Sequence, residues 1–252
     1  MRGLLRWMVL VLVASAALQL FFLARIALAA SIDPQSTSFQ RSEAWRLLTR
    51  KGQLRWRQQW IPYQAISDNL KRAVIASEDG SFTNHDGVDW EAVEKAWQRN
   101  AQAEERAAAR QSRRPPPGSE PALAPPAKPP RVVGGSTITQ QLAKNLLLSG
   151  ERTLLRKGQE FILTFALEKM LSKERILEIY LNSVEWGEGV FGAEAAAQHY
   201  YRKSASRLSA YEAARLAVML PRPRYFEKLP NSGYLASRAS TILARMRDAE
   251  LP

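Results

Sequence analysis

The chain has 252 residues, enough for one membrane anchor and a single domain of roughly 200 residues with its own core. It contains no cysteine, which excludes disulfides and thiolate metal sites. The formal net charge of +12 and the sequence pI near 10.2 predict anionic partners. Nucleic acid and an anionic membrane surface are the two ordinary candidates.

The first predicted element is a membrane-spanning helix near the amino terminus. No charged residue occurs from Trp7 to Ala24, a run just long enough to cross a bilayer core of roughly 30 Å. Arg2 and Arg6 precede this run, so the positive-inside bias keeps the amino terminus cytoplasmic and exports the rest of the chain. A cleaved signal peptide is the alternative, because residues 27–29 (ALA) suit a small-residue cleavage site. Either arrangement places the body outside the cytoplasm and argues against nucleic acid as the partner.

The next segments predict a polar connection, two helices and a flexible excursion. Residues 31–60 are rich in Arg, Gln and Trp and are interpreted as the connection. Helical patterns begin at Ser67 and at Asp89, which is a good N-cap. Residues 101–131 carry eight of the chain's 14 prolines and bury too little apolar surface to fold, so they predict a disordered loop. We expect its arginines to contact anionic lipid headgroups; a neutral insertion is the alternative.

The chain after Gly134-Gly135 is almost wholly helical in pattern. Helices are expected at residues 137–148, 153–171, 173–182, 192–201, 209–220 and 234–249. Ser209 and Glu212 have the spacing of a capping box, and Pro221 and Pro223 end that helix. Because strand signals are few, the sequence predicts a mainly α domain.

Residues 78–87, EDGSFTNHDG, form the first block with chemical meaning. Glu78 falls at the carboxyl end of the helix that begins at Ser67, where the helix macrodipole disfavours a negative charge. This placement would raise the pKa of Glu78 and make it a better base, provided that the site is partly desolvated. Taken alone, the block is more simply a solvated acidic turn, and His85 a structural turn histidine.

Residues 134–145, GGSTITQQLAKN, form a second block. Two glycines lead into a helix whose free backbone N–H groups predict an anion site. Gln141 and Asn145 lie one helical turn apart with Lys144 beside them, which suits a pyrophosphate-bearing substrate. The glycine-lysine spacing of a nucleotide P-loop is absent. A well-capped polar helix without a ligand is the alternative.

A third block contains Arg156, Lys157, Glu160 and Glu168. The spacings of four and eight residues place Arg156, Glu160 and Glu168 on one helical face. An ordinary surface ion pair between Arg156 and Glu160, worth about 0.2–0.5 kcal/mol, explains this block when it is taken alone.

Together these blocks resemble glycosyltransferase family 51, and within it the monofunctional biosynthetic peptidoglycan transglycosylases. Two more blocks follow in the family's order, RILEIYLNSVEWGEGVFG at residues 175–192 and EAARLAVMLP at residues 212–221. Since five ordered blocks agree over about residues 60–225, chance agreement is negligible. After the last block the chain has no room for a penicillin-binding domain, so no transpeptidase activity is expected. The excursion and Thr164, where many members have alanine, depart from the family pattern.

The resemblance implies a lysozyme-like helical domain with a small membrane-facing lobe. It implies transfer of an undecaprenyl-pyrophosphate-linked glycan to the 4-hydroxyl of lipid II, with inversion to a β-1,4 linkage. The enzyme would be a single-pass protein of the bacterial inner membrane with a periplasmic catalytic domain. Glu78 would be the catalytic base, and Glu160 a second catalytic carboxylate that assists pyrophosphate departure or holds a divalent cation, Mg²⁺ or Mn²⁺. The residues that the resemblance assigns to substrate binding are His85, Ser136, Thr137, Gln141, Lys144, Arg156 and Lys157.

Two other functions fit parts of the pattern. A lytic transglycosylase or lysozyme shares the helical scaffold and a single active glutamate, but it cleaves finished glycan and needs no cationic set for pyrophosphate. An inactive scaffold that recruits other cell-wall synthesis proteins would have no chemical reason to keep both Glu78 and Glu160. The expected partners are therefore lipid II, the lipid-linked glycan, the membrane and other cell-wall synthesis proteins, and not nucleic acid.

Overall fold

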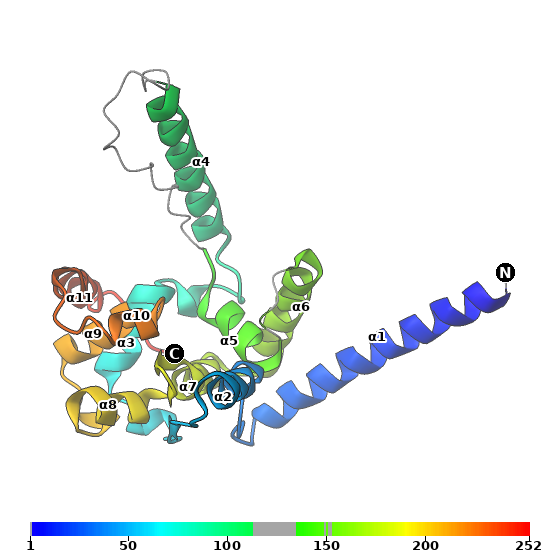
Figure 1. Ribbon diagram of the computed structural model, residues 1–252, viewed down its shortest axis with the longest axis horizontal. Coiled ribbons are helices and arrows are strands. Elements are labelled where there is room, and N and C mark those ends of the chain that lie inside the picture. The colour runs from blue at the N-terminus through cyan, green and yellow to red at the C-terminus, as the bar shows by residue number, and fades with distance from the viewer. Residues whose placement is uncertain (1, 113–134, 149, 151–152) are drawn as a thin grey trace. The chain divides into compact units, whose positions relative to one another are not determined.

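The computed structural model describes residues 2–112, 135–148, 150 and 153–252, and over these residues the protein is mainly α-helical (Figure 1). The chain divides into two compact units, Met1–Val88 with Thr137–Pro252, and Asp89–Ser136. The second unit contains α4 (Trp90–Ser112). The helices of the first unit are α1 (Arg2–Ala29), α2 (Ser38–Lys51), α3 (Asp68–Glu78), α5 (Ile138–Leu147), α6 (Leu154–Met170), α7 (Lys173–Ser183), α8 (Ala193–Tyr201), α9 (Ala210–Met219), α10 (Pro223–Phe226) and α11 (Gly233–Arg245).

Polar residues begin these helices where their spacing predicts. The Ser67 side chain caps α3, and Asp89 caps α4 by accepting a hydrogen bond from the backbone N–H of Ala92 at 2.7 Å. Ser209 and Glu212 form the capping box predicted for α9. The six helices expected after residue 137 are confirmed, each end lying within four residues of the predicted position.

The connection expected over residues 31–60 contains a helix that the sequence interpretation missed. A capping box of Thr37 and Gln40 begins α2, and Gly52 ends it with a φ of 62°, a left-handed conformation that glycine adopts without strain. Both signals are visible in the sequence, but the sparse apolar residues of SFQRSEAWRLLTRK conceal the helical period. The predicted connection therefore includes a regular helix at Ser38–Lys51.

The core of the first unit is built around α3. The buried face of α3 carries Leu70, Ala73 and Val74, as their spacing predicts, and it packs against α9 and α11. In the same unit, α5 packs against α2, α6 and α7. A small sheet has the strand order β1–β3–β2, with β1 parallel and β2 antiparallel to β3. Its strands are β1 (Arg57–Gln58), β2 (Glu185–Gly187) and β3 (Val190–Phe191).

The apolar amino-terminal run forms α1, which is long and apolar enough to cross a membrane. Most of its side chains are exposed, but Ile26 and Ala29 near its end are buried in the core. Gln19 exchanges two hydrogen bonds with Gln159 of α6, at 2.7 and 2.9 Å, and Arg175 Nε donates to the Ala29 carbonyl at 2.8 Å. Cleavage after Ala29 would remove these contacts between α1 and the domain.

The helix α4 extends further than the sequence interpretation expected. It continues to Ser112, through residues 101–112, where we expected the flexible excursion to begin. These residues are rich in Ala, Glu, Gln and Arg, which are strong helix formers, and the first proline of the excursion is Pro115. The prediction is wrong for residues 101–112. The remainder of the predicted excursion, residues 113–131, lies outside the described residues.

Candidate active site

Glu78 is the last residue of α3 and is half-buried. Its Oε2 accepts a hydrogen bond from Gln141 Nε2 at 3.0 Å, and its Oε1 accepts one from Ser77 Oγ at 3.3 Å. The Gln141 amide is oriented in turn by Tyr180, whose hydroxyl donates to Gln141 Oε1 at 3.0 Å. Side chains from α5 and α7 therefore fix the direction of the Glu78 carboxylate.

The pKa of the Glu78 carboxyl is raised above its ordinary value, with burial as the largest cause. The negative charge of Asp79 also raises this pKa, whereas the hydrogen bond from Gln141 and the positive charge of Lys144 lower it. A carboxylate that holds its proton more strongly is a better base at neutral pH. The partial desolvation on which the prediction for Glu78 depended is therefore present.

Asp79 joins the loop after α3 to the start of α5. Its Oδ2 accepts the backbone N–H of Ile138 at 2.9 Å, and its Oδ1 lies 2.9 Å from Nε2 of His85. The Nδ1 of His85 accepts the backbone N–H of Gly87 at 3.1 Å, which assigns the imidazole proton to Nε2. Both ring nitrogens of His85 thus have protein partners. In the structure His85 therefore connects residues of the loop after α3. Its contact with substrate stays a prediction.

Thr137 is buried and caps α5, because its Oγ1 accepts the backbone N–H of Gln140 and donates to the Gly87 carbonyl at 2.6 Å. The backbone N–H groups of Thr137, Ile138 and Gln140 all donate to side chains of the protein. The prediction that free N–H groups at this helix start bind an anion is therefore wrong for these three groups. Ser136 is exposed and is the last residue of the second unit.

A cavity of about 730 Å³ lies beside α5 and α6, and we call it the catalytic cavity. Its lining includes three of the predicted substrate ligands, Gln141, Lys144 and Arg156. Asn145, one turn from Gln141, lines it as well. Because the amide of Gln141 also holds Glu78, the candidate base is in direct hydrogen-bond contact with the cavity wall.

Glu160 of α6 is 4% exposed and lies between two cations. Its Oε2 is 3.2 Å from Arg156 Nη1, the pair that the four-residue spacing predicted, and its Oε1 is 2.5 Å from Lys157 Nζ. Within the described part of the chain, Arg156 Nε is buried and makes no hydrogen bond. Both carboxylate oxygens of Glu160 are engaged, and no group of three or more His, Cys, Asp or Glu side chains among these residues could hold a metal ion. Because both oxygens are paired with cations, Glu160 presents no free carboxylate oxygen to Mg²⁺ or Mn²⁺ in this arrangement.

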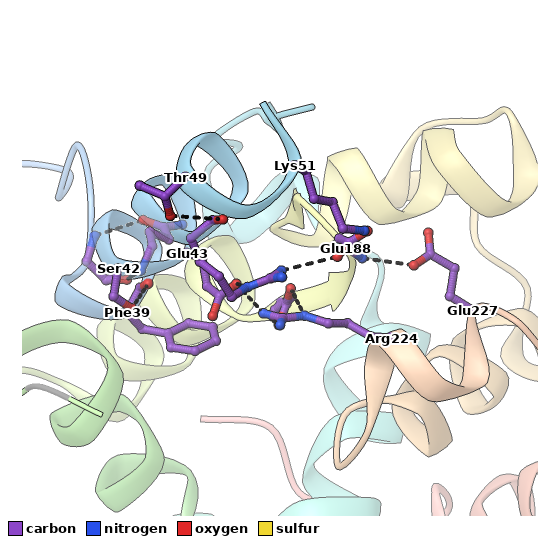
Figure 2. A network of polar contacts seen from close by, with 12 residues as sticks. Phe39, Ser42, Glu43, Thr49, Lys51, Glu188, Arg224 and Glu227 are labelled. Atoms are coloured by element: carbon purple, nitrogen blue, oxygen red, sulfur yellow. Dashed lines mark hydrogen bonds and ion pairs between the residues drawn. The ribbon is translucent and has the colours of Figure 1, made fainter. Parts of the chain in front are cut away.

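Sequence reasoning missed several residues that support the site, among them Asp79, Tyr180 and Glu185. Glu185 is buried in the wall of the catalytic cavity and accepts hydrogen bonds from Arg224 Nε at 2.8 Å and Nη2 at 3.0 Å. Arg224 also pairs with Glu43 of α2 at 2.5 Å (Figure 2). Arg224 therefore connects α2 to Glu185 in the cavity wall. Asp79, Tyr180 and Glu185 all lie within motif blocks, and this position was a usable signal. No local pattern connects positions 43, 185 and 224.

Gly87→Ala is expected to destabilise the loop that carries the Glu78 block. Gly87 has a φ of 88°, and an added Cβ would lie 2.7 Å from Thr164 Cγ2 and 2.9 Å from Glu168 Cγ. We expect a loss of about 1–3 kcal/mol in the free energy of unfolding, measured by urea denaturation of the detergent-solubilised chain. Gly80→Ala, whose added Cβ meets no atom within 4 Å, is the matched control and should change stability by less than about 0.5 kcal/mol. Equal stability of the two variants would contradict the tight packing at Gly87.

Comparison with known proteins identifies the family of the chain. A family model described as Transglycosylase matches residues 46–109 and 123–247, and the skipped residues fall within the predicted excursion. Three relatives are each named biosynthetic peptidoglycan transglycosylase. The protein from Herminiimonas arsenicoxydans is 49% identical over 253 residues, covering 100% of this chain and 99% of the relative. The protein from Burkholderia thailandensis is 53% identical (94% and 82% covered), and that from Paraburkholderia phytofirmans is 50% identical (99% and 95% covered). The chain therefore belongs to the transglycosylase family, glycosyltransferase family 51, with its mainly helical, lysozyme-like catalytic domain.

Proposed function

We propose that this chain polymerises lipid II into linear peptidoglycan glycan strands, transferring the undecaprenyl-pyrophosphate-linked chain to the 4-hydroxyl of lipid II. The observation that carries the proposal is the placement of Glu78, whose pKa is raised and whose carboxylate is held by Gln141 at the wall of a cavity lined by Lys144 and Arg156. An inverting transfer from a pyrophosphate donor needs a base for the acceptor proton and cations for the leaving charge. Gln141 connects these groups, because it holds Glu78 and lines the cavity together with Lys144 and Arg156.

The reaction is a single displacement at the anomeric carbon of the donor glycan. The 4-hydroxyl oxygen of lipid II attacks this carbon from the face opposite the pyrophosphate, so the α linkage of the donor becomes a β-1,4 linkage. The hydroxyl proton passes to the Glu78 carboxylate as the new carbon–oxygen bond forms. The old bond breaks, and its electron pair leaves on the pyrophosphate oxygen. Glu78 then releases its proton to solvent before the next addition.

The leaving pyrophosphate is stabilised by Lys144 and Arg156. The buried Nε of Arg156 has a donor that no described residue accepts, and a phosphate oxygen would satisfy it. Glu160 holds the Arg156 guanidinium and the Lys157 ammonium in place, because one of its carboxylate oxygens pairs with each. Of the two roles implied for Glu160, assistance to the leaving group fits this arrangement.

Incubation of the full-length protein with lipid II in detergent tests the proposal. A ladder of glycan products that lysozyme digests is the expected result. Preformed glycan added to a second reaction should keep its length. Shortened glycan without a ladder would assign a lytic activity instead, and no change in either reaction would leave only a scaffold role.

The value of kcat/KM is expected to fall at acid pH. This fall should begin at a higher pH than it would if the base were a glutamate with an ordinary pKa. Burial raises the pKa of Glu78, and below that pKa the neutral acid cannot accept the proton of the acceptor. Gln141→Leu removes a hydrogen bond that lowers this pKa, so the acid limb should move to higher pH in initial-rate measurements. Gln64→Leu, at an exposed position that contacts Glu174, should leave the profile unchanged. An unmoved limb in Gln141→Leu would contradict the assignment of the limb to Glu78.

We further propose that α1 stays attached as a single-pass anchor in the inner membrane, with the amino terminus cytoplasmic. Arg2 and Arg6 supply the charge bias. Arg175 supports retention, because it donates to the carbonyl of Ala29, which cleavage after Ala29 would remove. A lipid-linked substrate occupies the same membrane, so the anchor keeps enzyme and substrate together. Amino-terminal sequencing of the mature protein distinguishes retention from cleavage.

A further inference from the structure

A second cavity, of about 1050 Å³, is lined by residues that the catalytic cavity does not use. It lies where the end of α2 and the segment after it meet the turn between β2 and β3, the helix α8 and the residues after α10. We call it the basic cavity, because four cations line it: Lys51, Arg55, Arg57 and Lys228.

The charges of the basic cavity are unbalanced. Its two carboxylates already have partners, since Glu188 pairs with Lys51 at 2.5 Å and Glu227 accepts the backbone N–H of Glu188 at 2.9 Å (Figure 2). The side chains of Arg55 and Lys228, by contrast, are exposed and make no ion pair or hydrogen bond with the described residues. The cavity therefore offers positive charge to an anionic ligand.

Trp56 gives the basic cavity a fixed aromatic surface. Its ring stacks on Phe191, which is fully buried, with centroids 4.4 Å apart and planes inclined by 28°. The adjoining strand is held closely, because Arg57 N donates to the Gly189 carbonyl at 2.8 Å. Gly189 has a φ of 73°, and a Cβ there would lie 2.0 Å from the Arg55 carbonyl oxygen. The half-exposed indole is thus held in position before any ligand arrives.

We propose that the basic cavity binds the nascent glycan strand, a saccharide whose peptide stems carry carboxylates. Trp56 would stack on a sugar ring, and Arg55 and Lys228 would pair with stem carboxylates. Glu188 and Glu227 can accept hydrogen bonds from sugar hydroxyls. Because pockets of about 300–1,000 Å³ enclose drug-sized molecules, the cavity has room for more than one sugar. This inference rests on the proposed glycan polymerisation.

A strand held in the basic cavity stays attached to the enzyme between additions. The second contact makes rebinding in the catalytic cavity intramolecular, which raises its effective concentration. Loss of the basic cavity should therefore shorten the product, and the rate of the first addition should not change.

A direct binding measurement tests the basic cavity with two variants. We call them the groove variant, which removes three cations of the basic cavity, and the charge-matched control. The groove variant carries Arg55→Gln, Arg57→Gln and Lys228→Gln. The control carries Arg50→Gln, Arg207→Gln and Arg247→Gln, three exposed arginines that line neither cavity. The probe is a fluorescent, lipid-free tetrasaccharide of alternating N-acetylglucosamine and N-acetylmuramic acid with stem peptides, measured by anisotropy with the full-length protein in detergent. We expect the groove variant to bind about tenfold more weakly than the wild type and the control.

Two further binding measurements identify the ligand. Trp56→Leu alone should also weaken binding of the tetrasaccharide, and chitotetraose, which lacks carboxylates, should bind the wild type more weakly than the probe. Equal affinity of the groove variant and the control would overturn the proposal. A loss of binding to phosphatidylglycerol vesicles with none for the tetrasaccharide would assign the cavity to the membrane and overturn it as well.

Product length tests the consequence. In reactions with lipid II, the groove variant should consume substrate at an initial rate within about twofold of the control but yield shorter strands on gels. Strands as long as those of the control would mean that the cavity does not hold the product. If the wild type itself gave no strands, the proposed polymerisation would fail, whereas the binding of the soluble tetrasaccharide would still be measured independently.

Discussion

Replacing Glu78 by glutamine is expected to abolish glycan polymerisation and to leave the protein folded. The amide has nearly the same shape and can keep the hydrogen bond with Gln141, but it cannot accept the proton of the acceptor hydroxyl. Loss of a general base lowers the rate by about 10²–10⁴. The measurement is the initial rate of lipid II consumption, and Glu174→Gln, on the surface of α7, is the control that should retain the wild-type rate. Activity above about a tenth of wild type would refute the assignment of Glu78 as base.

The same variant should not lose stability. Burial raises the folded-state pKa of Glu78 above its unfolded value, so the folded protein binds this proton more tightly than the unfolded chain does. Stability therefore falls as the pH rises from the unfolded pKa through the folded pKa, and above that window the ionised carboxylate remains a cost to the folded state. Glutamine carries no charge, so the Tm of Glu78→Gln at pH 7 should equal or exceed that of the wild type. An inactive variant with a clearly lower Tm would point to misfolding as the reason.

The position of the candidate base could be predicted because its signals are local. Ser67 caps α3 and the apolar face of Leu70, Ala73 and Val74 sets its direction, so the sequence places Glu78 at the helix end. The i,i+4 pair of Arg156 and Glu160 follows from helical spacing in the same way. Such features depend only on residues within one or two turns, and backbone geometry then determines where they point.

Other parts of the site depend on contacts that sequence spacing cannot reveal. Glu43, Glu185 and Arg224 come together only when α2, β2 and α10 pack, and nothing near any of them indicates the partner. The anion site expected at the start of α5 illustrates the reverse error. Asp79, which belongs to another block of sequence, reaches this helix end and accepts the N–H group that a substrate would have used. Helix termini can be recognised in a sequence, but the group that satisfies them is a property of the fold.

Lys144→Ala is expected to lower kcat by about 10²–10³, because the ammonium lines the catalytic cavity where charge grows on the leaving pyrophosphate. Arg156→Ala should also weaken catalysis, but it is a less clean test, since it leaves the buried carboxylate of Glu160 with Lys157 alone and costs stability. Lys169→Ala, an exposed lysine of α6, removes the same charge outside the cavity and should have little effect.

The pH profile separates a role of Lys144 at the active site from a general loss of activity. The positive charge of Lys144 lowers the pKa of Glu78, so removing it should raise that pKa and move the acid limb of kcat/KM to higher pH. Lys144→Arg keeps the charge and should leave the limb near its wild-type position. Its rate should still be reduced, because a planar guanidinium does not replace a compact ammonium at the pyrophosphate. A Lys144→Ala variant with wild-type kcat and KM would exclude a pyrophosphate role for this residue. Reduced activity with an unmoved limb would place Lys144 too far from Glu78 to act in the same step.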